Sequence, residues 1–86
     1  MVKQTRADRI KAASELAFGP RGLTKMAAAA GVSKQLMAFI VAGDRDVTDD
    51  VYSRVADALR TEAGRMTKAA GKIEAMASAM VAELKE

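Results

Sequence analysis

Four aspartates that could bind a cation lie close together in the middle of the chain. They are Asp44, Asp46, Asp49 and Asp50. Clustered carboxylates suit Ca²⁺, but this stretch lacks the glycine and the terminal glutamate of a calcium-binding loop. Thr48 directly precedes two of the aspartates, and a hydroxyl followed by acidic residues is typical of the first turn of a helix, whose free amides attract negative charge. We therefore interpret the aspartates as loop and capping residues and expect no metal.

The inventory of reactive side chains excludes most enzyme chemistry. The 86 residues include no cysteine and no histidine, which excludes disulfides, thiolate or imidazole metal sites and histidine-activated nucleophiles. We therefore expect that the protein is not an enzyme and needs no cofactor or small-molecule ligand. No segment resembles a signal peptide or an apolar span of about twenty residues, so we expect a cytoplasmic protein without membrane contact.

The net charge of +3 is unevenly distributed along the chain. Residues 1–45 contain eight Lys or Arg and three Asp or Glu, whereas residues 46–86 contain six and eight. The first half therefore carries +5 and the second −2, which together give the total. Excess positive charge attracts the phosphate backbone of nucleic acids, so the first half is the candidate for such a contact.

Residues 23–42 predict two short helices separated by a tight turn. Apolar residues recur every three or four positions, which gives each helix one buried face. These residues are Met26, Ala27 and Ala30 in the first helix and Met37, Ile40 and Val41 in the second. Gly31 can adopt the positive φ that ends the first helix, and Ser33 can cap the second. Helices this short are stable only when packed, so we expect them to dock on neighbouring helices.

Two further helices are expected on either side of this pair. Thr5 can cap a helix that runs to about Phe18 and ends at the Gly19-Pro20 pair. Its predicted buried face consists of Ile10, Ala13, Leu16 and Ala17. Thr48 can cap another helix that runs to Leu59. The alanine-rich and methionine-rich composition, without β-branched runs, favours closely packed helices over strands.

Residues 61–86 predict a fifth helical stretch with an apolar stripe. Glycines at positions 64 and 71 allow a bend or a break, and whether this helix continues from the preceding one is open. The stripe contains Met66, Ile73, Met76, Ala77, Met80 and Leu84. A chain this small often gains stability by oligomerising, so we expect the stripe to form a homodimer. The alternative is that the helix folds back over the core of its own domain.

The middle of the chain resembles the helix-turn-helix domain of phage repressor and Cro-like transcription regulators. The resemblance is carried by Ala27, Gly31-Val32-Ser33, Met37, Ile40 and Gly43, and it runs without gaps from about Leu23 to Leu59. The small size is also similar to that of the controller proteins of restriction systems. The resemblance implies an all-α, compact five-helix helix-turn-helix domain in residues 1–60, with residues 61–86 as an extended C-terminal dimerisation helix.

The function implied by this resemblance is sequence-specific binding to double-stranded DNA. The chain would be a homodimeric, autoregulatory repressor or controller on an inverted-repeat operator, with two recognition helices about 34 Å apart. The alternative is a protein-interaction module of the antitoxin or antiactivator type, which acts through its C-terminal helix.

The resemblance also implies which residues contact DNA. The outward side chains of the second helix of the pair would read base edges, and these are Ser33, Lys34, Gln35, Ala38 and Phe39. Gln35 suits adenine, and Lys34 suits guanine or a phosphate. Phe39 would either contact a thymine methyl group or be buried by a neighbouring helix or a dimer partner. Candidates for phosphate contacts are Arg21, Lys25, Arg45, Arg54 and Arg6. Leu23 stands where the family often has a phosphate-binding glutamine, so Arg21 or Lys25 must replace that contact.

Overall fold

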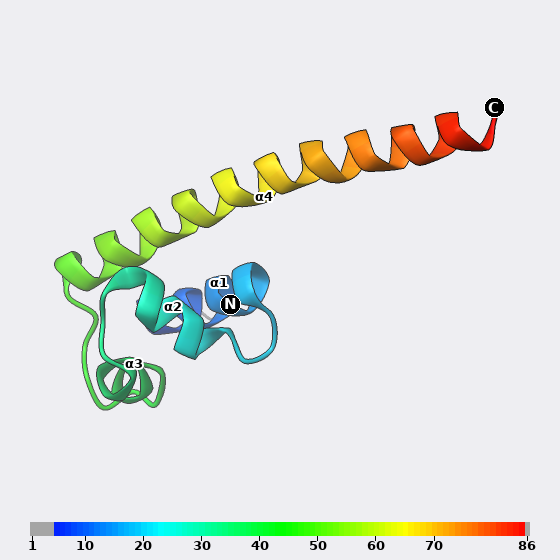
Figure 1. The fold of residues 1–86 in the computed structure, drawn as a ribbon. Helices are drawn as coiled ribbons and strands as arrows, with labels where there is room; N and C mark the ends of the chain where they lie inside the picture. The colour runs from blue at the N-terminus through cyan, green and yellow to red at the C-terminus, as the bar shows by residue number, and fades with distance from the viewer. Residues whose placement is uncertain (1–4, 86) are drawn as a thin grey trace.

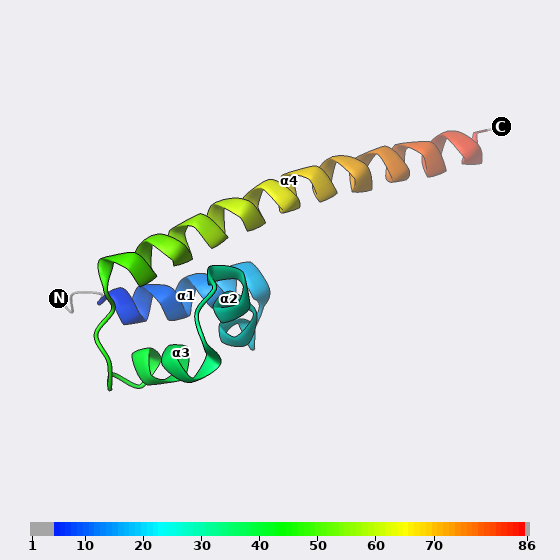
Figure 2. The same ribbon diagram turned by 60° about the vertical axis from the view of Figure 1, so that its left-hand side comes forward.

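The computed structural model describes residues 5–85 and contains four α-helices in this part of the chain. They are α1 (Arg6–Phe18), α2 (Gly22–Ala30), α3 (Lys34–Val41) and α4 (Asp49–Leu84). The three short helices pack beneath the first part of α4, and the rest of α4 extends away from them as a single rod (Figures 1 and 2). The molecule is therefore elongated, with extents of 61 × 31 × 19 Å. The all-α prediction is confirmed.

The predicted N-caps start three of the helices. The Oγ1 of Thr5 accepts a hydrogen bond from the Asp8 amide at 3.0 Å, and the Asp8 carboxylate accepts one in return from the Thr5 amide at 3.3 Å. At the start of α4, the Oγ1 of Thr48 accepts from the Val51 amide at 3.2 Å. These side chains satisfy amides that have no partner within the helix, so the boundaries follow from local sequence.

The core lies where the three short helices meet the first part of α4. Its buried apolar residues are Ile10, Met26, Ala27, Ala30, Met37, Ile40, Val55 and Ala58. The predicted face of α1 was partly wrong, because Leu16 is 86% exposed while Ser14 is buried. The Ser14 hydroxyl donates to the carbonyl oxygen of Ile10 at 2.7 Å. Gly22 at the start of α2 lies directly against the Ser14 backbone of α1, so this contact leaves no room for a side chain at position 22.

The fourth and fifth helical stretches, whose continuity the sequence left open, form one helix. Both Gly64 and Gly71 lie inside the 36-residue α4, and neither has a positive φ. A glycine costs a helix about 1 kcal/mol but keeps its N–H group, so it does not interrupt the hydrogen-bond ladder as proline would. The five-helix prediction is therefore corrected to four helices among the described residues, of which the last is long.

The second half of α4 does not fold back over the core. Its large apolar side chains are exposed, and both ribbon views show this part of the helix leaving the body formed by α1, α2 and α3 (Figures 1 and 2). The fold-back alternative is therefore wrong. Within residues 5–85, no helix combines the length and the apolar character that a membrane span requires.

The continuity of α4 predicts the effect of removing one of its glycines. Gly64→Ala should stabilise the protein by about 0.5 to 1 kcal/mol, because alanine favours a helix and a Cβ there would meet nothing within 4 Å. Urea unfolding followed by circular dichroism measures the change. Gly43→Ala is the matched control, since its Cβ also meets open space but its φ of 86° should make the substitution destabilising. A loss of stability at position 64 would contradict a continuous helix.

Candidate nucleic-acid interface

The turn between α2 and α3 has the geometry that its sequence predicts. Gly31 ends α2 in the left-handed region, with φ of 72° and ψ of 32°. The Val32 amide then donates to the carbonyl oxygen of Ala27 at 2.9 Å. Ser33 restarts the chain, because its Oγ accepts a hydrogen bond from the Leu36 amide at 3.1 Å. With Ala27 only 1% exposed at the helix contact, the turn holds α3 in a fixed orientation against α2.

One face of α3 is buried and the opposite face is open to solvent. Met37 and Ile40 point into the core, where they contact side chains of the other helices. The exposed face carries the five predicted base-reading residues, Ser33, Lys34, Gln35, Ala38 and Phe39. Phe39 is 40% exposed, so no neighbouring helix of this chain buries it. The structure thus brings all five side chains to one surface.

Two shallow hollows flank the exposed ridge of α3. The first separates α3 from the start of α2 and is lined by Leu23, Thr24, Lys34, Met37, Ala38 and Val41. The second lies on the other side of the ridge and is lined by Ser33, Gln35, Leu36, Phe39 and Arg45. A protruding helix between two hollows can enter the groove of a duplex, whereas it offers no enclosed site for a small substrate.

Arg45 lies at the edge of the α3 surface. It shares the second hollow with Gln35 and a further hollow with Arg6 at the start of α1. The guanidinium of Arg6 donates to the Asp49 carboxylate at 2.8 Å and to the carbonyl oxygen of Val47 at 3.3 Å. Its Cζ also stands 4.8 Å from the centre of the Tyr52 ring. Arg6 therefore ties α1 to the start of α4, while Arg45 borders the residues of α3.

Two more predicted phosphate contacts lie on α2 and at its start. Arg21 is the exposed N-cap residue of α2 and makes no side-chain capping bond. The exposed Lys25 lies toward α4, since its charge reaches Glu62. The pKa of Glu62 is lowered mainly by a hydrogen bond from Arg65, against partial desolvation, and further by the charges of Arg65 and Lys25. Among the described residues, Lys25 thus interacts with Glu62 on α4, whereas no interaction of Arg21 with α4 is found.

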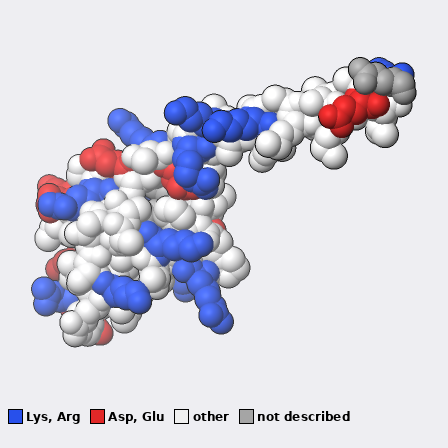
Figure 3. Space-filling model, in the orientation of Figure 1, with Lys and Arg blue, Asp and Glu red and all other residues white. Residues whose placement is uncertain are grey.

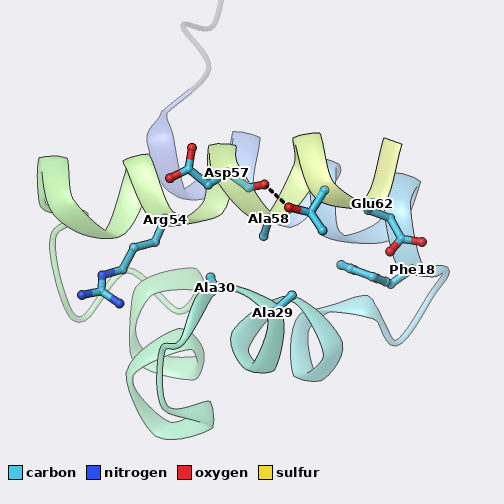
Figure 4. Close-up of a pocket in the computed structure, with 8 residues that line it drawn as sticks. Phe18, Ala29, Ala30, Arg54, Asp57, Ala58 and Glu62 are labelled. Carbon is cyan, nitrogen blue, oxygen red and sulfur yellow. Dashed lines mark hydrogen bonds between the residues drawn. The ribbon is translucent and has the colours of Figure 1, made fainter. Parts of the chain in front are cut away.

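Arg54 borders the turn from the side of α4. It pairs with Asp50 at 2.9 Å, and a Cβ on Gly31 would lie 3.3 Å from its Nη1. Figure 4 shows Arg54 at one end of an open pocket between α2 and α4. The pocket is lined by Phe18, Ala29, Ala30, Arg54, Asp57, Ala58, Thr61 and Glu62. Its two carboxylates would repel a phosphate, so this pocket is not part of the candidate DNA surface.

Thr24 is a candidate contact that the sequence did not single out. It is exposed on α2 and lines the first hollow together with Lys34. Its hydroxyl can donate to a phosphate oxygen. Thr24 stands two residues before the buried Met26, a spacing that places the two side chains on different faces of a helix. This spacing could have identified Thr24 as an exposed residue from the sequence.

Basic side chains spread over the part of the body that lies below α4, with a few acidic ones between them (Figure 3). This distribution agrees with the excess positive charge of the first half of the sequence. In the described part of the chain, no group of three His, Cys, Asp or Glu side chains could hold a metal ion. No protein-family model, curated protein or solved structure matches the chain.

Proposed function

We propose that this protein is a sequence-specific DNA-binding regulator of transcription, which reads the major groove with α3. One observation carries the proposal. The face of α3 that carries Gln35 is exposed beside Arg45, while the opposite face is fixed in the core by Met37 and Ile40. A short helix anchored in this way presents its first turn as a rigid ridge, which is what direct readout of bases requires.

The side chains of this ridge suit base edges. The Gln35 amide can donate to and accept from adenine at the same time, and Lys34 can donate to guanine or to a phosphate. Ala38 and Phe39 can contact the methyl group of thymine. Ser33 retains a hydroxyl proton that it can donate, because its oxygen acts as the acceptor in the N-cap. These groups would supply the specificity of the complex.

Contacts to the DNA backbone would come from the two edges of the ridge. Arg45 borders the hollow beside Gln35, and Thr24 borders the hollow beside Lys34, so the two could hold phosphates on either side of the groove. Arg21 precedes Thr24 at the start of α2. Arg6 and Lys25 contribute positive charge near α4, through the Asp49 pair of Arg6 and the effect of Lys25 on Glu62, while Arg54 pairs with Asp50 and lies beside Gly31 at the α2–α3 turn.

We further propose that the protein acts in the cytoplasm as a homodimer on an inverted-repeat operator. The resemblance to Cro-like repressors and controller proteins suggests that it regulates its own promoter. The apolar stripe on the second half of α4 supports dimerisation, since water-exposed surfaces rarely carry so many large apolar side chains in a row.

Titration with DNA tests the proposed activity. The purified protein is added to the duplex upstream of its own coding sequence and to a random duplex of equal length, at two salt concentrations. We expect a preference of about a thousandfold for the upstream duplex. Equal affinity for both duplexes at both salt concentrations would contradict sequence-specific binding to the upstream duplex. A failure to bind either duplex would contradict it as well.

The exposed stripe also favours a second candidate function, in which α4 binds another protein. Its large apolar residues are exposed along several turns, as in helices that insert into a partner's groove. In that case the whole protein would form a stoichiometric complex with a different chain and would show no preference for any DNA sequence.

A further inference from the structure

The part of α4 that leaves the body, residues 63–84, carries two rows of apolar side chains, and we refer to it as the free segment. One row is large and repeats every seven residues, with Met66, Ile73 and Met80. The other row has the same spacing and consists of the small Ala63, Ala70 and Ala77, followed by the large Leu84. The exposed fractions of the large side chains on this segment range from 42% at Met66 to 86% at Leu84. A surface of this kind is normally covered by a partner.

We propose that the free segment pairs with the free segment of a second copy of this chain, in antiparallel orientation and centred near residue 75. The inference rests on the homodimer of the proposed function and specifies its interface. Three properties of the free segment support this orientation: the alternation of large and small side chains, the distribution of charge and the length of the segment.

The two apolar rows are complementary in size only when the helices run in opposite directions. A centre near residue 75 places Ile73 against the partner's Ala77 and Met80 against the partner's Ala70. In these two pairings a large side chain meets a small one, which lets the helices approach closely, while Met66 meets the partner's Leu84 at each end of the pair. In a parallel pair each residue meets its own equivalent. Alanine would then face alanine and leave gaps, while methionine faces methionine.

Charge favours the same orientation. The first half of the free segment carries Arg65, Lys68 and Lys72, whereas the second half carries Glu74 and Glu83. Figure 3 shows basic side chains on the part of the rod near the body and acidic ones toward its far end, with further basic atoms at the tip.

Arg65 and Glu83 carry opposite charges at the two ends of the free segment, and Arg65 also pairs with Glu62 of its own helix. Arg65 and Glu83 are 18 residues apart, which is about five full turns, so they lie on the same flank of the stripe. Antiparallel pairing brings Arg65 and the partner's Glu83 to the same level along the pair, twice in each dimer. Parallel pairing brings like charges together instead.

The length of the free segment fits an antiparallel pair without a clash. Glu62 of α4 still lines a pocket with Phe18, the large side chains from Ile73 onward are more than half exposed, and α4 ends at Leu84. In the proposed register the partner's Leu84 lies against Met66, just beyond the body. Leu16 would then be close to the end of the partner helix. Leu16 lies about one turn after Ala13, which faces α4, and on the same side of α1. The end of the partner helix would cover part of the Leu16 side chain, which is 86% exposed in the single chain.

This arrangement separates the two α3 helices widely. Val55, where the body packs on α4, lies 20 residues before the centre of the pair, or about 30 Å along the helix. The two bodies are then about 60 Å apart along the paired helices, so their α3 helices cannot occupy successive major grooves about 34 Å apart. We therefore expect the half-sites of an operator to be separated by more than one turn.

Disulfide trapping tests the orientation, because the chain contains no native cysteine. The double variant Met66→Cys/Leu84→Cys should form an interchain disulfide on mild oxidation, in roughly tenfold higher yield than Met66→Cys or Leu84→Cys alone. The matched control is Gly71→Cys/Ser78→Cys, which has the same register but lies on the opposite face of α4 and should stay reduced. All four substituted sites are exposed, so the fold of the body should not change.

The possible outcomes separate this inference from the proposed function. Efficient crosslinking of each single variant would indicate a parallel pair and would overturn the proposal. Sedimentation of the unmodified protein as a monomer at micromolar concentration would overturn it as well. Since the trap contains no DNA, a protein that crosslinks as expected but does not bind DNA would refute the proposed function alone. A monomer that still prefers its operator would refute only the dimer.

Discussion

Gly22→Ala is expected to destabilise the protein by about 2 to 4 kcal/mol, because the added methyl group has no space. A Cβ at this position would overlap the carbonyl oxygen of Ser14 and would lie 2.7 Å from its carbonyl carbon and 3.1 Å from the Cβ of Phe18. The closest atoms belong to the backbone of α1, so no side-chain rotation can relieve the contact. For a domain this small, the loss would be a large part of a total stability of about 5 kcal/mol.

Urea denaturation of the wild type and of Gly22→Ala measures this effect through the transition midpoint. Gly64→Ala serves as the comparison, since the same chemical change at an open helix position should move the midpoint in the opposite direction. An unchanged midpoint for Gly22→Ala would show that α1 and α2 can separate without cost. The close contact that fixes the start of α2 would then not be essential for the fold.

The second large effect is expected on DNA binding. Gln35→Ala should cost about 1 to 3 kcal/mol on the preferred duplex, or roughly 5-fold to 150-fold in affinity, and should relax the preference at one base pair. Affinity for random DNA should hardly change, because the amide contributes no charge to phosphate binding. Equal losses on the preferred and the random duplex would contradict base reading by Gln35.

Arg45→Ala should give the contrasting result. Removal of this charge beside α3 should weaken binding to all sequences and reduce the slope of log affinity against log salt by about one. Arg60→Ala is the matched control, because it removes the same charge from an exposed position on α4. The account predicts a clearly smaller change for Arg60→Ala. If both substitutions acted alike, only the net charge of the protein would matter for binding.

The features that could be predicted from the sequence depend on short-range interactions. Thr5, Ser33 and Thr48 cap their helices by accepting hydrogen bonds from the amides three residues ahead, so the residue type and the next few positions determine the boundary. Gly31 ends α2 for a similarly local reason, since it adopts a positive φ. The exposed face of α3 followed from the spacing of its apolar residues.

The features that could not be predicted depend on contacts between distant segments. Leu16 has the right spacing for the core of α1, but the close approach of Gly22 to Ser14 decides which side of α1 is buried. Gly64 carries no local signal that distinguishes a break from a continuous helix. Arg6 bonds to Asp49, 43 positions away, and no local pattern identifies that pair. Tertiary contacts override single-residue preferences at such positions.

The candidate site shows the same division. The outward residues of α3 follow from helical periodicity, and Thr24 joins them only because α2 and α3 enclose one hollow. Its partner in that hollow, Lys34, is ten residues away, across the turn. The preferred base sequence depends on the fit of several side chains to a duplex, so periodicity cannot supply it.

The most direct test of the central claim is an NMR titration of the isotope-labelled protein with its preferred duplex. The account predicts that the largest amide shifts occur at residues 33–39, at Thr24 and at Arg45, with small shifts in residues 63–84. This pattern would place the DNA on the exposed ridge of α3. Shifts concentrated in residues 63–84, with α3 unaffected, would contradict the proposal that α3 reads DNA.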